Sequence, residues 1–410
     1  MPQIKILLVG YNGANNTGAE ALLLSDIKDV RAVFGPEALI TVPTLNETNL
    51  RRYVQEGPNL HIVAMPTIFP FALRQLVAEH DLIMLVEGHC YMDDSTSLLL
   101  WAYLWATHCA HTMGKPSLAY SVDAGRLMPV NQRLVRQEAS KTDLIITRSQ
   151  AAADRLHASG VTAPIKVTAD NALTFETSRS DEGWVQQSWP ETSSGLVGLA
   201  MVNYYLWPVV LRPWGKREDC YKWPYYFSTS PERRHAAAEL ADGYAKLADC
   251  LVREHDKAIA LICMEELDEP FAHRVQQQMA YASRSRIFSA SKHSASQMTT
   301  LLRSLDLLVT SRYHGCILSL AGQVPQLAVG HDLRLKTIYD ELGFTDQFFI
   351  DGHVQNPCVG LKERVEILLA NPSLEKESLR RGYEEHLSKA RGNRELLRSF
   401  AKEHSWEVVA

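Results

Sequence analysis

Short apolar runs alternate with longer helical patterns, and this alternation constrains the fold of the 410-residue chain more than any other feature. In the first half, β-branched and aliphatic runs predict strands over 4–9, 38–42, 61–64, 82–86, 117–122, 144–147 and 165–167. Helical patterns lie between them, for example over 71–79, 98–111 and 151–158. Such alternation is typical of βαβ units, which form a parallel sheet covered on both faces by helices.

A polar stretch over 178–195 interrupts this pattern, and a second series of predicted strands follows it, over 197–201, 259–263, 286–288, 307–310 and 326–329. We therefore expect an α/β protein with two Rossmann-like, doubly wound parallel-sheet domains that face a cleft. The expected parts are an N-terminal domain over 1–177, a linker over 178–195, a C-terminal domain over 196–355 and a helical tail over 356–410. Ligands of such sheets bind beyond the carboxyl ends of the strands, so the cleft is the expected site.

Composition excludes several classes of protein. The 42 basic and 47 acidic residues argue against a general nucleic-acid binder. The longest apolar run, 98–106, is far shorter than the ~18 residues of a membrane span, and the N-terminus does not read as a signal peptide. Seven dispersed Cys residues without a CxxC pair indicate reduced thiols and no metal site. We expect a cytoplasmic protein. Peripheral association with the inner face of the membrane and homo-oligomer formation stay open.

Two motifs follow predicted strands. A glycine-rich turn from Gly10 to Gly18 could bind an anion at a helix N-terminus, but it is neither GxGxxG nor a P-loop, and glycines that only turn the chain explain it equally well. Arg312 and His314 follow the predicted strand 307–310. A guanidinium offers a planar fork for phosphate or carboxylate, and an imidazole can transfer a proton near neutral pH, although a lone His at a helix start is often structural.

These residues carry a resemblance. Ser311-Arg-Tyr-His314, with the following 317–325, resembles the Arg-x-His segment of the polysaccharide pyruvyl transferase family. The N-terminal Gly10-Tyr-x-Gly13-x-x-Asn16-x-Gly18-x-Glu20 resembles the opening motif of the same family. Weaker similarities lie at 81–88, 148–149, 168–172 and 294–306.

The resemblance implies a fold like that of the B-type glycosyltransferases. It also implies transfer of a pyruvyl group from phosphoenolpyruvate to two sugar hydroxyls, which forms a cyclic ketal and releases phosphate. Phosphoenolpyruvate is then the donor substrate, no separate cofactor or metal is needed, and the acceptor is a sugar, a glycan or a lipid-linked saccharide. His314 becomes the candidate general acid. Candidate cations for the donor are Arg312, Arg334, Arg212 and Arg217, of which the last two could equally be solvated loop charges.

On the acceptor side, a carboxylate should help to deprotonate the attacking hydroxyl, and Glu20, Asp93, Asp94 and Asp170 stay open for this role. Asn16, Glu87 and His89 belong to motifs in the same half, where most departures from the family pattern lie. Nine aromatic residues between Tyr204 and Phe227 suggest an insertion whose tryptophans stack on the acceptor, or one that packs only on itself. The tryptophans concerned are Trp207, Trp214 and Trp223.

Two other functions stay open. A nucleotide-sugar-dependent glycosyltransferase would have the same architecture, although no nucleotide-binding signature stands out in the second half. An inactive polysaccharide-binding or assembly protein would explain the N-terminal departures, but the Arg312–His314 pair argues against it.

Overall fold

The computed structural model describes residues 3–330, 333–352, 354 and 357–409. The chain forms two compact units, Met1–Phe175 with Glu385–Ala410, and Glu176–Glu384. Each unit contains one large sheet in which every strand pair is parallel. The expected fold class, two Rossmann-like parallel-sheet domains with helices at the C-terminus, is confirmed.

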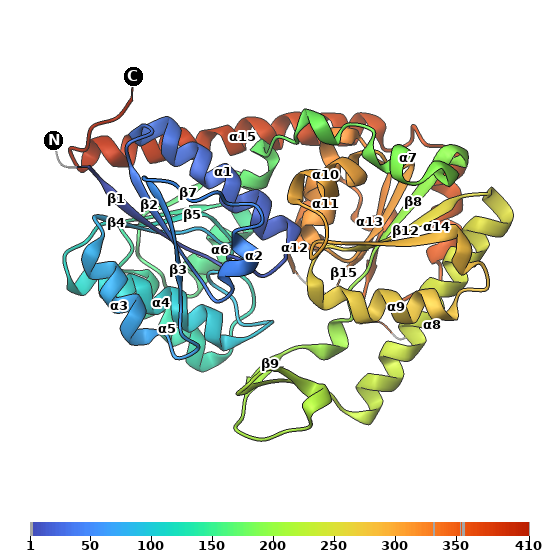
Figure 1. Cartoon of the computed structure of the whole chain (residues 1–410), viewed down its shortest axis with the longest axis horizontal. Coiled ribbons are helices and arrows are strands. Elements are labelled where there is room, and N and C mark those ends of the chain that lie inside the picture. Colours follow the sequence, from blue (N-terminus) through green and yellow to red (C-terminus); the bar gives the residue numbers. More distant parts are fainter. Residues whose placement is uncertain (1–2, 331–332, 353, 355–356, 410) are drawn as a thin grey trace. The chain divides into compact units, whose positions relative to one another are not determined.

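The first unit has a seven-stranded sheet in the order β3-β2-β1-β4-β5-β6-β7. Its strands are β1 (Lys5–Val9), β2 (Leu39–Thr44), β3 (Leu60–Ala64), β4 (Leu82–Leu85), β5 (Ser117–Val122), β6 (Leu144–Thr147) and β7 (Ile165–Val167). The helices of this region are α1 (Thr17–Phe34), α2 (Glu47–Leu50), α3 (Pro70–Glu79), α4 (Ser97–Thr112), α5 (Pro129–Ala139) and α6 (Gln150–Ala158). Figure 1 shows α1 and α15 on one face of this sheet, and α3, α4 and α5 on the other.

Strand alternation in the first unit separates two hydrophobic cores. Leu7 and Ile83 pack into the core that includes α3 and α4, whereas their neighbours Ile6 and Met84 pack into the core that includes α1. Successive side chains of a strand point to opposite faces, so a central strand must be apolar throughout to be covered on both faces. This explains why the central run 82–86 contains no polar residue.

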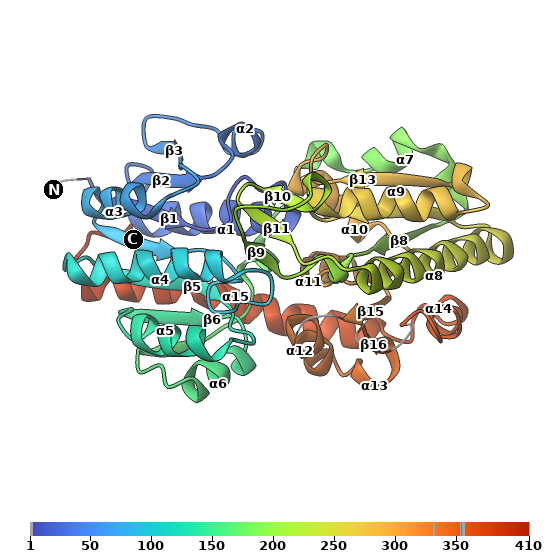
Figure 2. The same cartoon turned by 90° about the horizontal axis from the view of Figure 1, so that it is seen from below.

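The second unit has a six-stranded sheet in the order β13-β12-β8-β14-β15-β16, and a separate three-stranded antiparallel sheet, β10-β11-β9. The large sheet contains β8 (Leu196–Ala200), β12 (Ala258–Cys263), β13 (Ser285–Ser289), β14 (Leu307–Thr310), β15 (Gln326–Gly330) and β16 (Phe349–Asp351). The small sheet contains β9 (Val209–Leu211), β10 (Cys220–Lys222) and β11 (Tyr225–Phe227). The helices, labelled in Figures 1 and 2, are α7 (Trp184–Ser188), α8 (Pro231–His255), α9 (Glu269–Gln278), α10 (Ala295–Arg303), α11 (Tyr313–Ser319), α12 (Leu333–Leu342), α13 (Thr345–Phe348), α14 (Leu361–Ala370) and α15 (Lys376–Glu403).

The polar stretch 178–195 is built into the second unit rather than left as a free linker. It forms the 3₁₀ helix Arg179–Asp181, α7, and a second 3₁₀ helix, Pro190–Ser194. Trp189 is 1% exposed, with its ring centroid 5.9 Å from that of Phe288, and the Trp184 indole donates a hydrogen bond to the carbonyl of Gln297 at 3.1 Å. Two tryptophans therefore anchor a segment whose overall composition is polar.

The C-terminal region is not a separate tail over 356–410. Residues 385–410 belong to the first unit, and helix α15 contains the boundary between the units. Leu397, Phe400 and Ala401 are at most 2% exposed and join the core on the α1 face of the first sheet. The expected boundary at 355/356 lies outside the described residues.

Candidate functional site

The carboxyl edge of the second sheet carries the clearest cluster of charged side chains. Strand β14 ends at Thr310, and Arg312 then caps helix α11 in an extended conformation, with φ −106° and ψ 123°. The Thr310 hydroxyl accepts a hydrogen bond from the Arg312 N–H at 3.0 Å and donates one to the Arg312 carbonyl at 2.9 Å. A Cβ on Gly315 would lie 2.7 Å from the same hydroxyl, so this turn requires glycine there.

The Arg312 guanidinium reaches across β8 to the strand on its other side, β12. Its Nε donates to Asp268 Oδ2 at 3.0 Å, its Nη2 contacts Asp268 Oδ1, and its Nη1 lies 3.0 Å from Glu265 Oε2. Both carboxylates are almost fully buried. Burial lowers the pKa of Arg312, but the two carboxylates outweigh it, so this pKa lies above its usual value. Burial raises the pKa of Asp268 to about 6, against the opposing effect of Arg312.

His314 lies in the first turn of α11, so the backbone from 312 to 314 changes from extended to helical. The spacing rule of a strand, by which residues 312 and 314 would share a face, does not apply there. The His314 ring packs edge-on against Tyr313 at 5.2 Å, and the Arg334 guanidinium lies 6.0 Å from the Tyr313 ring. The structure therefore places His314 and Arg334 beside the Tyr313 ring, whereas the Arg312 guanidinium is turned toward Asp268 and Glu265.

Sequence reasoning missed Glu265 and Asp268. Both belong to the acidic run Glu265-Glu-Leu-Asp-Glu269, directly after β12. Charged residues that immediately follow a buried strand are the signal that could have identified them, by the same argument that identified Arg312.

A cavity of about 460 Å³ lies in the second unit beside this cluster. Leu267, from the turn that carries Glu265 and Asp268, lines it together with Phe227, Phe271 and Asn203. Three arginines also line it, Arg233, Arg234 and Arg274, and none of them was predicted. Arg233 donates to the carbonyls of Tyr205 and Trp207, and Arg234 pairs with Asp219 at 3.0 Å. Glu218 and Asp219 line the cavity as well, so its charge is mixed. Its aromatic and guanidinium groups can contact a small anion that has an apolar part.

The predicted cations Arg212 and Arg217 lie in the aromatic insertion. The Arg212 guanidinium stacks over Tyr226 at 4.9 Å, and the exposed Arg217 begins the 3₁₀ helix Arg217–Asp219. Of the predicted tryptophans, Trp207 packs edge-on against Phe227 at 6.0 Å, and Phe227 lines the cavity. Trp214 and Trp223 are 75% and 65% exposed.

The first unit has its own polar cluster at the carboxyl edge of its sheet. Arg148, after β6, is fully buried, with Nε 2.8 Å from Asp123 Oδ2 and Nη1 2.6 Å from Asp170 Oδ2. A Cβ on Gly88 would lie 2.5 Å from Arg148 Nη1, so the Glu87-Gly88 turn fits closely around this guanidinium. Asp170 also accepts a hydrogen bond from the Ala172 N–H at 2.8 Å. The predicted Asp170 is therefore part of a buried ion-pair network.

The glycine-rich turn after β1 is held by local contacts. Gly13 has φ +77°, and a Cβ there would lie 2.5 Å from both Thr44 Oγ1 and the Asn46 carbonyl oxygen. Its N–H donates to the Tyr53 hydroxyl at 3.0 Å. Asn16 is the N-cap of α1 and accepts from the N–H groups of the two residues after Thr17, at 3.0 and 3.1 Å. The turn needs these residues for its own geometry.

The remaining predicted residues of the first unit separate into two places. Glu20 is 1% exposed and lies 3.6 Å from Arg52. Glu87 lies 3.4 Å from His89 Nδ1. Burial raises the pKa of Tyr53, and the charges of Glu20 and Glu87 add to this rise. Asp93 lies apart from them, where it accepts hydrogen bonds from the Met128 N–H and the Asn131 amide and so fixes the start of α5.

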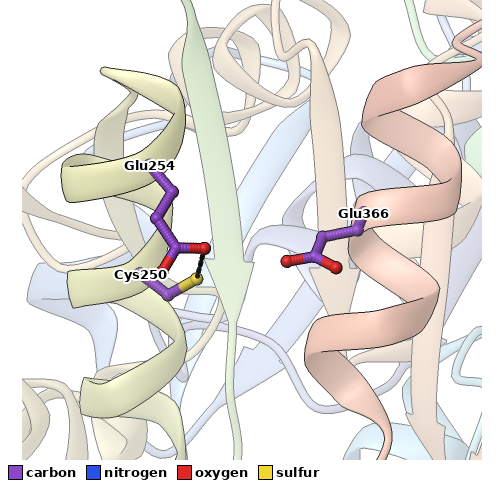
Figure 3. A group of neighbouring side chains, drawn as sticks. All are labelled: Cys250, Glu254 and Glu366. Carbon is purple, nitrogen blue, oxygen red and sulfur yellow. Dashed lines mark hydrogen bonds between the residues drawn. The ribbon is translucent and has the colours of Figure 1, made fainter.

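Among the described residues, one group of three side chains has the spacing of metal ligands: Cys250 and Glu254 on α8, and Glu366 on α14 (Figure 3). The Lys362 ammonium lies 2.8 Å from Glu254 and 3.4 Å from Glu366. Burial raises the pKa of the Cys250 thiol, which donates a hydrogen bond to Glu254 at 3.2 Å. Metal binding needs a thiolate, so this group is better described as an ion-pair cluster that joins two helices.

Residues 16–332 match the model of the family described as polysaccharide pyruvyl transferase, and the chain belongs to this family of transferases. A search of curated proteins gives no match. Within the described part of the chain, no helix has the length and apolar character that crossing a membrane requires.

Solved structures share the fold. S. aureus MnaA, solved with UDP, aligns with 99% of this chain and 98% of its own, with a TM-score of 0.64 and 10% identity. A UDP-GlcNAc 2-epimerase from Neisseria meningitidis, bound to UDP-GlcNAc, aligns over 97% and 100%, with a TM-score of 0.60 and 8% identity. Anabaena HepE, in complex with UDP and glucose, aligns over 98% and 100%, with a TM-score of 0.60 and 14% identity. At these identities the likeness shows the glycosyltransferase-B-like fold alone.

Proposed function

We propose that the protein transfers the pyruvyl group of phosphoenolpyruvate to a pair of hydroxyls on a sugar, glycan or lipid-linked saccharide, with formation of a pyruvate ketal. The observation that carries this proposal is the Arg312-x-His314 pair at the carboxyl edge of the second sheet, in a chain that belongs to the pyruvyl transferase family. The chemistry needs no redox partner. We further propose that the protein works in the cytoplasm, at or near the inner face of the membrane.

In the proposed reaction, C3 of the enol gains a proton and C2 becomes open to the first sugar hydroxyl. The bond between C2 and the phosphate oxygen then breaks, and the second hydroxyl closes the ketal at C2. Of the two hydroxyl protons, one balances the proton on C3 and the other leaves with phosphate. His314 is the proposed acid at C3, a role typically worth ~10²–10⁴-fold in rate.

Arg312 and Arg334 are the proposed cations for the donor phosphate. A guanidinium has five N–H donors. That of Arg312 makes three contacts with carboxylates, two with Asp268 and one with Glu265. These carboxylates hold the arginine in one orientation, so the guanidinium needs little reorganisation when the donor binds. The cavity lined by Arg233 and Arg274 is a second place for the anionic end of the donor.

For the base that accepts the hydroxyl proton, the contacts of the first unit favour Glu20. Asp93 is engaged in fixing the start of α5, and Asp170 is ion-paired with Arg148. Glu20 is buried and lies 3.6 Å from Arg52, a longer ion pair than the 2.6 Å contact that holds Asp170. The exposed Asp94 stays an alternative.

A thermal-shift comparison tests the donor. Phosphoenolpyruvate at 100 times its Kd should add ~2.7 kcal/mol of stability and raise Tm, whereas UDP and UDP-glucose should not. Arg312→Lys should reduce this shift because a point charge cannot replace a planar fork. Arg286→Lys is the matched control, since Arg286 stacks on Trp189 instead.

The other outcomes identify the alternatives. Stabilisation by UDP or a UDP-sugar and not by phosphoenolpyruvate would favour a nucleotide-sugar glycosyltransferase, for which the solved structures with bound UDP are the supporting observation. Stabilisation by a glycan alone would favour the inactive binding or assembly protein.

A further inference from the structure

The small antiparallel sheet of the second unit has two different ends. Its register pairs Tyr225 with Leu211, and Phe227 with Val209. The Val209–Phe227 end joins the rest of the unit, because β9 follows Trp207 and β11 leads into α8. The opposite end carries the loop after β9 and the turn between β10 and β11. We call this end the tip, defined as residues 210–217 and 221–224; the small sheet is labelled in Figure 2.

Local contacts hold the tip together. The Arg212 N–H donates to the Pro224 carbonyl at 3.0 Å, and the Trp223 indole donates to the Pro213 carbonyl at 3.4 Å. Arg212 also stacks on Tyr226, and a Cβ on Gly215 would lie 2.5 Å from the same ring. The loop and the turn are therefore neighbours, and their side chains form one surface.

This surface exposes large apolar side chains. Trp214 is 75% exposed, Trp223 65% and Leu211 58%. The aromatic packing that supports the small sheet comes from other residues, because Tyr226 is buried and Phe227 packs against Trp207 and Tyr221. The two tip tryptophans therefore contribute little to the packing of the insertion. Exposure of their apolar rings to water is unfavourable, and such exposed patches often mark interaction surfaces.

The charge around these side chains is positive. Arg212, Lys216, Arg217 and Lys222 all lie in the tip. Glu218 lies 3.7 Å from Lys216 and 3.5 Å from Arg234 of α8, and Asp219 lies 3.0 Å from Arg234. Arg234 therefore offsets part of the charge of these two carboxylates, and the exposed Lys216–Glu218 pair is weak. An indole ring is amphipathic and suits the boundary between lipid headgroups and acyl chains. The surrounding lysines and arginines are attracted to anionic headgroups.

We propose that the tip docks on a membrane surface that contains anionic lipids. Trp214, Trp223 and Leu211 enter the interface, and the four cations bind headgroup phosphates. A sugar-stacking role would place a ring against one indole in an enclosed site, whereas here two indoles and a leucine are mostly exposed among cations. The membrane contact is argued from exposure and charge alone. Only its biological role rests on the proposed function, because membrane docking would bring the enzyme to a lipid-linked acceptor.

Vesicle flotation with the full chain tests the proposal without donor or acceptor. The wild type should float with vesicles of phosphatidylcholine and phosphatidylglycerol, and at least ~10-fold less with phosphatidylcholine alone. The double variant Trp214→Ser, Trp223→Ser should lose at least ~10-fold in affinity for the anionic vesicles. Lys216→Gln should lose ~5-fold, and raised salt should weaken binding of the wild type.

Tyr281→Ser is the matched control, because Tyr281 is an aromatic residue of the same unit, 40% exposed and outside the tip. Unchanged Tm values for all variants exclude unfolding as the cause. The proposal is overturned if the wild type does not float with anionic vesicles, or if the double variant floats equally well. A third outcome would also overturn it: a soluble glycan raises the Tm of the wild type but not that of the double variant, and the two proteins bind vesicles equally well. Failure of pyruvyl transfer would leave the flotation result unchanged, so the two proposals fail separately.

Discussion

At the residue scale, the guanidinium of Arg312 connects two strand ends that lie on either side of β8. Arg312 and His314 could be predicted from the sequence as candidate site residues, because the sequence alone shows polar residues that follow an apolar strand. The partners Glu265 and Asp268, which lie more than forty residues earlier, were not predicted. That pairing depends on the strand order β12-β8-β14, which no local pattern encodes.

Replacement of His314 by Gln should leave donor binding largely intact and lower kcat by at least ~10²-fold, since glutamine keeps a similar size but cannot transfer the proton. Steady-state phosphate release measures kcat, and the donor-induced Tm shift measures binding. His273→Gln on the exposed face of α9 is the control and should be neutral. Near-normal turnover of the His314 variant would refute the acid role and make His89 the next candidate.

Glu375 gives a pH prediction. Its carboxylate is 1% exposed and accepts a hydrogen bond from the Gln326 N–H at 2.7 Å. Burial raises its pKa from 4.5 to about 8. Between pH 4.5 and about 8, Glu375 keeps a proton in the folded chain that it has lost in the unfolded chain. The contribution of Glu375 to the free energy of unfolding is therefore complete below pH 4.5 and is lost as the pH rises toward 8.

Glu375→Gln removes this ionisation and keeps the acceptor oxygen, so the variant should gain stability over the wild type at pH ~8.5 and little at pH ~5. The expected gain is at most ~5 kcal/mol, because the pKa rises from 4.5 to about 8 and one pKa unit corresponds to ~1.4 kcal/mol. Urea unfolding at both pH values measures it, with the exposed Glu363→Gln as control. An equal effect of Glu375→Gln at both pH values would contradict a raised pKa.

At the scale of elements, the strands of both large sheets except β16 were predictable, because each is a run of apolar residues between turns. The small sheet was not. Its three strands have three residues each, and the aromatic residues of β10 and β11 fit an irregular insertion equally well. The aromatic cluster predicted an insertion at this place without its strand pairing.

Helix α15 shows a second limit at this scale. Its charged composition predicted a separate tail, but Leu397, Phe400 and Ala401 give it an apolar stripe that completes the first unit. Arg394 adds an ion pair to Asp29 at 2.7 Å, and Asn393 donates to the Ala169 carbonyl at 3.0 Å. The buried stripe also includes His386, Ala390 and Asn393. Because these positions hold small or polar residues, the stripe is easily hidden among charged residues in the sequence.

Phe400→Ala should therefore destabilise the protein by ~3–5 kcal/mol, the usual cost of removing a buried aromatic ring. Lys402→Ala, two positions later and exposed, should change stability by less than ~0.5 kcal/mol. Urea unfolding followed by circular dichroism measures both. Equal unfolding midpoints for the two variants would mean that the end of α15 does not contribute to the core.

At the scale of the whole molecule, the fold class follows from the alternation of strands and helices, and the family follows from the order of modest motifs along most of the chain. The limits of the units do not follow from composition. Trp184 and Trp189 bind the polar stretch 178–195 into the second unit, and α15 returns the chain end to the first. Tertiary contacts over long sequence separations decide these limits.

Pyruvyl transfer to a saccharide is tested by measuring phosphate release from phosphoenolpyruvate in the presence of candidate saccharide acceptors. The product is then examined by NMR. The proposed function predicts release that depends on an acceptor with two suitably placed hydroxyls, one ketal methyl signal per phosphate released, and loss of both in His314→Gln. Phosphate release without a ketal product, or sugar transfer from a UDP-sugar by the same preparation, would contradict it.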